Sequence, residues 1–423
     1  MPPGRSRFGG PAVSVAVTIL RIYPAFAAGY LLSYLVRSVN AVISPELTRE
    51  FGLASGALGL LTSAYFVTFS ALQIPAGILL DRYGPRRVEP VLLVVAAIGC
   101  FAFAAADGLA GLTFARALIG AGVAICLMAP LKAIATWFPR DRQASLSGWM
   151  MVAGAAGALA ATTPVEFALR YVDWRLLFVG IGAFALVSAI AIFSTVPDLP
   201  RQAEPPSVRA QLDGVRRVFV EPRFWWIVPV GGLGMGSFMA IQGLWSVPWM
   251  MEVEGWTRAE AARVLLGMGF SLLAGYLFLG FAATRLARRG IGSSHLYLAG
   301  WALHVAAIVA IASRAPAAEF WWCLYGLGAG ANILAFTVLN EGFPASLAGR
   351  ANTAINLAMF GSTFVTQWGI GMAVDAARAA FGWSTAEGLR FAFAVAAALV
   401  SATYVWFLAG WRRYAVLQRP APN

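Results

Sequence analysis

The sequence is poor in charge and has almost no histidine. Charged residues make up 12% of its 423 positions, against about 25% in a typical soluble domain. The two histidines, His295 and His304, lie nine residues apart in one apolar stretch, on roughly opposite sides of a helix. The sequence shows neither a Ser/His/Asp set nor a phosphate-binding loop. These absences argue against an enzyme and predict no cofactor.

Cysteine is also scarce, with three residues in the chain. Cys100, Cys126 and Cys323 all fall within apolar stretches, so the sequence indicates no disulfide framework. Met235 and Met239 form an i, i+4 pair whose thioethers could bind copper(I). No histidine or cysteine joins them, and methionine in an apolar helix usually serves packing. We therefore predict no metal site.

Apolar residues dominate instead, at 60% of the chain with a mean hydropathy of +0.73. A soluble fold of this size could not hide so much apolar surface from water, whereas a bilayer can. A spanning helix needs about 20 mostly apolar residues, and the 44 glycines suit closely packed spanning helices. We predict an all-α integral membrane protein with twelve transmembrane helices, at about 20–43, 57–80, 88–106, 112–135, 143–165, 174–196, 223–250, 259–284, 292–313, 319–341, 351–374 and 389–411.

The positive charge follows the loops between these spans. If the N-terminus is cytoplasmic, nineteen arginines fall in cytoplasmic segments and six in the loops on the other side. This asymmetry obeys the positive-inside rule and predicts a multi-pass protein of a bacterial-type inner membrane, with both termini in the cytoplasm. A basic face for nucleic acid does not account for the net charge of +12. The apolar stretch after Arg5 and Arg7 extends beyond a signal-peptide core, so we interpret it as a retained first helix.

A polar stretch at 197–222 divides the twelve spans into two sets of six. We predict an N-terminal six-helix bundle at 1–196 and a C-terminal one at 223–423, joined by this cytoplasmic linker. The halves look related, because the loop that begins at Gly77 is similar to the one that begins at Gly280, 203 residues later. Internal repeats are common in secondary transporters, which bind their substrate between the repeats near the middle of the membrane.

The loop after the second span carries a specific pattern, Gly-x-Leu-x-Asp-Arg-x-Gly-x-Arg-Arg, and span 4 has an arginine followed by glycines, at Arg116, Gly120 and Gly122. Both resemble signature motifs of the major facilitator superfamily, and the twelve-span topology extends the resemblance over essentially the whole chain. The resemblance implies an alternating-access transporter of two pseudo-symmetric six-helix bundles. It also implies a central cavity lined mainly by spans 1, 4, 7 and 10.

The same loop is the candidate conformational latch. Its glycines would let helix ends approach closely, and Asp81 can pair with an arginine or accept hydrogen bonds from a helix N-terminus. We expect this group to hold the halves together in the outward-facing state and to release them when they rock. Its members are Gly77, Asp81, Arg82, Gly84, Arg86 and Arg87, with Arg285 in the second half.

Charged side chains inside a membrane are costly, so each marks a candidate functional site. Arg37 lies deep in span 1, where Tyr34 and Asn40 share its helix face at a spacing of three residues. An arginine among amides and aromatic rings suits an anionic solute, although Arg37 could instead snorkel toward the membrane surface. The other candidates for substrate binding are Tyr65, Arg116, Gln242, Trp245, Asn332 and Asn356.

The roles of the basic residues of span 4 and of the coupling group stay open. Arg116 either structures the cavity, as the resemblance implies, or snorkels to the outer interface. Lys132, the single lysine, is either a gate or an interfacial anchor. Glu166 and Glu341, at span ends, are the candidates for proton coupling. Alternatively, the substrate's own proton or exchange provides the coupling.

Together these features predict proton-coupled import of a small organic anion by rocker-switch alternating access, in a monomer. Span 5 lacks the Gly-Pro-x-x-Gly-Gly pattern of the family's drug antiporters, and spans 5 and 11 lack the Gly-Asn run of its nitrate carriers. Proton-coupled export of drugs, siderophores or metabolites is therefore the alternative rather than the first choice. A non-transporting receptor or scaffold of the same fold is the alternative from another class.

Overall fold

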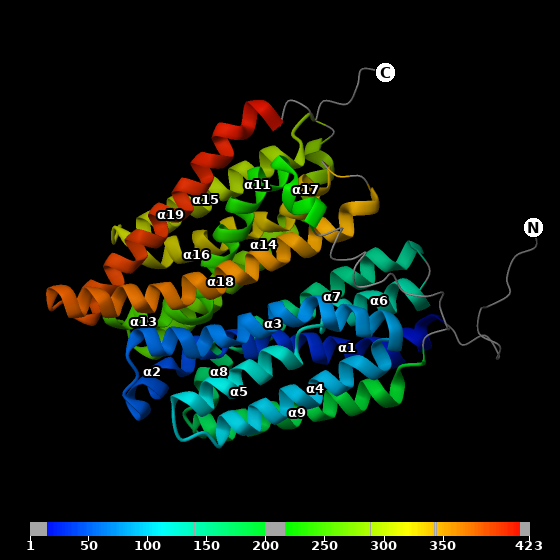
Figure 1. Cartoon of the computed structure of the whole chain (residues 1–423), viewed down its shortest axis with the longest axis horizontal. Coiled ribbons are helices and arrows are strands. Elements are labelled where there is room, and N and C mark those ends of the chain that lie inside the picture. Colours follow the sequence, from blue (N-terminus) through cyan, green and yellow to red (C-terminus); the bar gives the residue numbers. More distant parts are fainter. Residues whose placement is uncertain are drawn as a thin grey trace, which may run out of the picture.

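The computed structural model describes residues 15–138, 140–198, 216–287, 289–341, 343 and 345–414. These residues form helices joined by turns, with no strand among them. Figure 1 shows two bundles of helices lying side by side, one from each half of the sequence. Most of the predicted linker, at 199–215, lies outside the described residues.

The first half runs from the N-terminal helix to the end of the sixth predicted span. Its helices are α1 (Val15–Ser38), α2 (Asn40–Phe51), α3 (Ser55–Tyr83), α4 (Pro85–Ala104), α5 (Leu109–Gly122), α6 (Met128–Trp137), α7 (Arg140–Ala160), α8 (Thr163–Ala168) and α9 (Trp174–Thr195).

The second half covers predicted spans seven to twelve. Its elements are α11 (Pro222–Val228), η1 (Pro229–Gly234), α12 (Met235–Ala240), η2 (Ile241–Trp245), α13 (Ser246–Glu252), α14 (Arg258–Ala287), α15 (Ser293–Ala312), α16 (Ala318–Ala329), η3 (Gly330–Asn332), α17 (Ile333–Asn340), α18 (Ala345–Phe381) and α19 (Thr385–Tyr414).

The two halves repeat the same helix pairings. In the first half α1 lies against α7, α3 against α5, and α4 against α9. The corresponding pairs of the second half are α12 with α18, α14 with α16, and α15 with α19. The internal repeat therefore extends from the loop motif to the packing of the helices.

The predicted spans match these helices in order, although several of them are not continuous. Nine helices in the described part of the chain are long and apolar enough to cross a membrane, or ten if α1 and α2 form one bent span. Span 4 is divided into α5 and α6, and span 5 into α7 and α8, so the expectation of one helix in each is wrong. The break in span 4 follows Gly122, a residue that weakens helices. The break in span 5 precedes Pro164, which starts a helix better than it continues one.

Spans 1, 7 and 10 are interrupted as well. The first span bends by 44° between α1 and α2, at Val39. Span 7 contains two π-helical segments, η1 and η2, and span 10 contains the 3-10 turn η3. Irregular turns re-aim side chains and free backbone groups, and they are frequent at functional sites. All four spans that the resemblance places around the cavity therefore depart from a regular helix.

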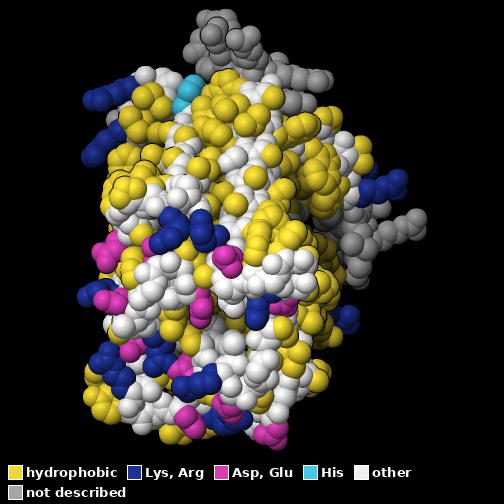
Figure 2. Space-filling model, turned by 90° about the vertical axis from the view of Figure 1, so that its left-hand side faces the viewer, with side chains coloured by type: hydrophobic (Ala, Val, Ile, Leu, Met, Phe, Trp, Pro, Cys, Tyr) yellow, Lys and Arg dark blue, Asp and Glu magenta, His cyan; other side chains and the backbone are white. Residues whose placement is uncertain are grey.

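The halves meet most extensively along α3 and α18. They lie together at the end of the molecule that holds α2 and α13, and they diverge toward the end that holds both termini (Figure 1). We call the first of these the sealed end. An ion pair between Glu46 of α2 and Arg258 of α14 joins the halves there. Figure 2 views this end face on and shows acidic and basic side chains intermixed over it.

Candidate functional site

The Arg37 side chain lies near the end of α1, two residues before the bend at Val39, and aromatic rings surround it. Its guanidinium carbon is 4.5 Å from the centroid of the Tyr34 ring, 5.2 Å from Phe69 and 5.4 Å from Phe360. Tyr34 and Phe69 belong to the first half, whereas Phe360 comes from α18 of the second. Arg37 therefore lies at the boundary between the two halves, where alternating access would place a substrate.

The Arg37 guanidinium is buried and has no acidic partner in the described part of the chain. The residue is 8% exposed, so it does not snorkel to the surface. None of the ion pairs among the described residues includes it. A buried cation without a counter-charge is costly, and an anion would relieve that cost. Cation–π contacts with the rings offset part of it.

Three predicted residues of the first half hold α1 in place behind Arg37. The Arg116 guanidinium donates a hydrogen bond to the backbone oxygen of Val36, with an N···O distance of 2.8 Å. Val36 lies in the last turn of α1, where carbonyl groups lack partners within the helix. The Tyr65 hydroxyl donates to the Ser33 oxygen at 3.4 Å. Arg116 is fully buried, so its interpretation as a snorkelling residue is wrong.

Asn40, the third of these residues, is fully buried at the start of α2. Its amide donates to the Thr62 hydroxyl of α3 at 3.1 Å. The sequence predicted that Asn40 shares a helix face with Tyr34 and Arg37. That prediction assumed one continuous helix, and the bend at Val39 interrupts this helix. Asn40 thus ties the bend to α3.

Gln242 and Trp245 both belong to the π-helical turn η2, beside Arg37. A Cβ built on Gly243 of this turn would lie 3.6 Å from the Arg37 backbone oxygen. The Trp245 indole nitrogen donates to the Gln367 oxygen of α18 at 2.9 Å, so its ring turns toward α18. Because a π turn is wider than an α-helical one, Gln242 and Trp245 do not share one face as residues three apart in an α-helix would.

The predicted asparagines of the second half lie apart from the aromatic group around Arg37. Asn332, in the 3-10 turn η3, donates to the Met359 sulfur at 3.6 Å. Asn356 is half-buried on α18. No described contact joins either residue to Arg37, so their assignment to substrate binding stays a prediction.

The described ion pairs of the predicted latch lie within the first half or join it to the start of the linker. The Lys132 ammonium lies 2.6 Å from a carboxylate oxygen of Asp81 and also donates to the Leu80 oxygen at 3.1 Å. Arg86 and Arg87 both pair with Asp198, just after α9. In this conformation the partner of Asp81 is thus Lys132, where the sequence suggested an arginine.

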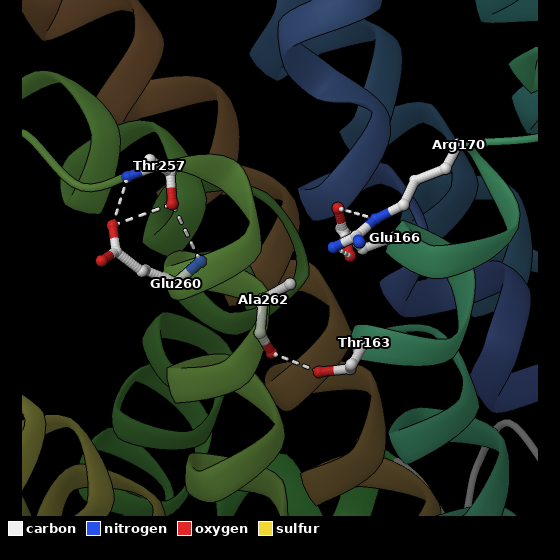
Figure 3. Close-up of polar contacts among 6 residues, drawn as sticks. All are labelled: Thr163, Glu166, Arg170, Thr257, Glu260 and Ala262. Atoms are coloured by element: carbon white, nitrogen blue, oxygen red, sulfur yellow. Dashed lines mark hydrogen bonds and ion pairs between the residues drawn. The ribbon is translucent and has the colours of Figure 1, made fainter.

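Glu166, one of the two coupling candidates, forms an ion pair at the sealed end. Both of its carboxylate oxygens accept hydrogen bonds from Arg170, at 3.2 and 3.0 Å (Figure 3). This carboxylate raises the pKa of Arg170, which lies outside the spans. Nearby, the Thr163 hydroxyl donates to the Ala262 oxygen at 3.3 Å, across the boundary between the halves. The other candidate, Glu341, is exposed after α17.

Sequence reasoning overlooked one acidic residue, Glu89 in the second turn of α4. Like the acids that it considered, Glu89 lies near the end of a predicted span, but its side chain is fully buried. The available signal was a single acid in an apolar run, Val88-Glu89-Pro90-Val91, at the start of predicted span 3. An unpaired acid in such a run is a functional candidate by default.

Two repeated bundles, interrupted central spans and a buried cation between the halves define a membrane transporter of the alternating-access class. The chain belongs to the Major Facilitator Superfamily, whose sequence pattern matches residues 26–367. Membership of this family of transporters confirms the predicted fold and the expectation that the chain is not an enzyme.

The chain is similar to curated transporters of sugar acids. It is 31% identical to a hexuronate transporter of Escherichia coli (strain K12) over 163 residues, which are 38% of each chain. It is 24% identical to a D-galactonate transporter of Escherichia coli O6:H1 over 313 residues, 68% of this chain and 69% of that one. The match to the hexuronate transporter thus spans about two fifths of that protein's length.

Among solved structures, the chain shares its fold with a bacterial homologue of the human lysosomal transporter Spinster, in an inward-facing and unoccupied conformation. The TM-score is 0.76 at 19% identity, over 97% of this chain and 100% of that one. At this identity the likeness concerns the fold alone.

Proposed function

We propose that this protein imports a small organic anion, of the sugar-acid class, together with a proton. The observation that carries the proposal is the Arg37 guanidinium, buried among aromatic rings from both halves without an acidic partner in the described residues. An arginine can bind a carboxylate through two parallel hydrogen bonds, which fixes the orientation of the ligand as well as its charge. Closure of the halves around Arg37 would then join substrate binding to the conformational change.

The sugar-acid class is supported by the relatives and by the surroundings of Arg37. Hexuronate and D-galactonate are the substrates in the names of two of the proteins that this chain resembles. Tyr34 and Gln242, both half-buried beside Arg37, have polar groups that suit sugar hydroxyls. The aromatic rings offer flat apolar faces for the C–H side of a sugar chain.

The arrangement of the helices supports an assignment of each end of the molecule to one side of the membrane. The positive-inside rule places both termini in the cytoplasm, so the sealed end would face outward. The structure would then be an inward-facing state, as in the Spinster homologue with the same fold. We also propose a division at the 197–222 linker into two six-helix bundles, which the repeated helix pairings support.

Uptake of labelled D-galacturonate into proteoliposomes tests the substrate class. We expect uptake by the wild-type protein and its loss in Arg37→Ala. Arg37→Lys keeps the charge but not the paired donors, so we expect a Kd at least about 10-fold higher than that of the wild type.

Arg175→Lys is the matched control, because Arg175 is also an arginine over an aromatic ring. Its guanidinium carbon lies 4.2 Å from the Trp174 ring centroid, but it pairs with Glu50 within the first half. We expect this variant to transport normally. Normal uptake by a folded Arg37→Ala variant would contradict the anion-site proposal.

A further inference from the structure

Glu89 is a fully buried acidic residue of α4 to which the function proposed above assigns no role. Neither of its oxygens has a hydrogen-bond partner among the described residues. The carboxyl lies beside Gly29 of α1, and a Cβ built on that glycine would also lie within 4 Å of the Leu93 and Ile192 side chains. An ionised carboxylate in such a buried position would carry a large desolvation cost, which favours the protonated form of Glu89 in this conformation.

The space for the Glu89 carboxyl comes from a glycine on α1. A Cβ built on Gly29 would lie 2.9 Å from the Glu89 Oε1 atom, closer than two such atoms normally approach. Gly29 precedes Arg37 by eight residues on the same helix, which is about 12 Å along the axis. The buried acid thus lies beside the helix that carries the proposed anion-binding arginine.

The interruption of span 4 also lies next to Glu89, apart from its contact with Gly29. Cys126, between α5 and α6, is fully buried, and its thiol lies near the Glu89 carboxyl without a hydrogen bond of ordinary geometry to it. Unwound backbone inside a membrane protein is tolerated where it lines a cavity or an ion pathway. The carboxyl therefore lies between α1 and the interrupted span 4, where a small rearrangement of span 4 could admit water.

The charged groups on the elements around Glu89 have contacts elsewhere. Those of α4 itself, Arg86 and Arg87, pair with Asp198. On span 4, Lys132 pairs with Asp81, and Arg116 donates to Val36. On α1, Arg37 contacts aromatic rings, and the Tyr30 hydroxyl donates to the Met151 sulfur. On α9, Arg175 pairs with Glu50 at the far end of the helix. Among the described titratable groups, Cys126 is the one that lies near the Glu89 carboxyl.

We propose, on the basis of the import function above, that Glu89 binds the co-transported proton. A proton from the outer side would form the carboxyl O–H bond, and that bond would break when the carboxyl is hydrated and the proton leaves to the inner side. The buried position beside Gly29 favours the neutral form of the carboxyl, so protonation would favour the packed arrangement of α1 and α4. One proton with one monovalent anion makes the transport cycle electroneutral.

A gradient experiment in proteoliposomes tests the coupling role. The wild-type protein should accumulate D-galacturonate when the outside is acidic relative to the inside. Glu89→Gln mimics the protonated form, so it should keep galacturonate exchange at equal pH and lose accumulation driven by the proton gradient. Glu50→Gln, which removes an acid from an ion pair at the sealed end, should behave as the wild type. Proton-driven accumulation by Glu89→Gln equal to that of the wild type would overturn the proposal, as would accumulation driven by sodium instead of protons.

A second measurement does not depend on the substrate. Dicyclohexylcarbodiimide enters apolar sites and adds to protonated carboxyl groups, so the Glu89 peptide should gain its mass at acidic pH and less as the pH rises. Glu89→Gln should remove this labelling. If the wild-type protein neither exchanges nor accumulates galacturonate but Glu89 is labelled, the substrate class is wrong and the proton site stands. If Glu89 is unlabelled at every pH while the wild type transports, the proton site is wrong and the function stands.

Discussion

The carboxylate of Asp375 accepts a hydrogen bond from the backbone N–H of Gly56, with an N···O distance of 2.7 Å. Asp375 lies on α18 in the second half, and Gly56 lies in the first turn of α3 in the first half. The second oxygen of Asp375 accepts the N–H of Ser55 at 3.1 Å. A side chain of one half thus caps a helix of the other, and it satisfies N–H groups that the helix itself leaves unpaired. This cap can exist only while the sealed end is closed.

Loss of this cap should therefore shift the conformational equilibrium. In Asp375→Ala we expect the closed form of the sealed end to lose about 1 kcal/mol, the usual contribution of a helix cap. Spin labels at the exposed positions Arg49 and Arg378, one in each half at this end, would then show a larger fraction of molecules with a long distance between the two labels.

The matched control is Asp173→Ala. Asp173 caps α9 through the N–H of Leu176 at 2.7 Å, entirely within the first half. It should lower the melting temperature without changing the distance distribution. The same distribution in Asp375→Ala as in the wild type would rule out a role of this cap in closure.

Gly371 should be intolerant of any side chain when the sealed end is closed. A Cβ built on it would lie 2.3 Å from the backbone oxygen of Ser55, so α3 and α18 could not approach as they do. We expect Gly371→Ala to favour the state that is open at this end and to slow transport by at least about 10-fold, because each cycle requires closure.

Gly369→Ala provides the comparison on the same helix. No atom lies within 4 Å of a Cβ at this position, and alanine favours a helix over glycine by up to about 1 kcal/mol in water. Transport should therefore persist. Equal transport rates in the two variants would show that the close approach at Gly371 is not needed for the cycle.

The latch hypothesis makes opposite predictions for Asp81 and Lys132. If Asp81 joins the halves in the outward-facing state, Lys132 competes for it in the present state, through the contact of 2.6 Å. Asp81→Asn should then increase the population seen here, whereas Lys132→Ala should decrease it. The same pair of spin labels measures both. A shift in the same direction for both variants would indicate a pair that only stabilises the first half.

Several features of the fold were predictable because their signals are local in the sequence. Apolar runs located the spans, and the loop from Gly77 to Arg87 indicated the family. Arg37 was identified because a charge inside an apolar run is rare in itself. Continuity of the spans was less predictable. Hydropathy reports how apolar a segment is, and it does not report whether the helix is broken at Val39, after Gly122 or by the π turn η2.

Residue partners were the least predictable part. Nothing in the sequence around Asp81 selects Lys132 over an arginine, and Trp245 could face Arg37 or α18 according to the local helix pitch. Such choices depend on how neighbouring helices are rotated and on which backbone groups the interruptions leave free.

The sequence by itself determined that this protein spans the membrane in two related halves and carries a cation in its first span, since each of these is a property of short segments. Only the tertiary structure decided that Phe360 covers Arg37, that Asp375 caps α3, and that Glu89 is buried against Gly29. These contacts join residues far apart in the chain, and they exist because the helices pack in one particular arrangement. The Glu89 side chain would be an ordinary polar one if that packing did not remove it from water.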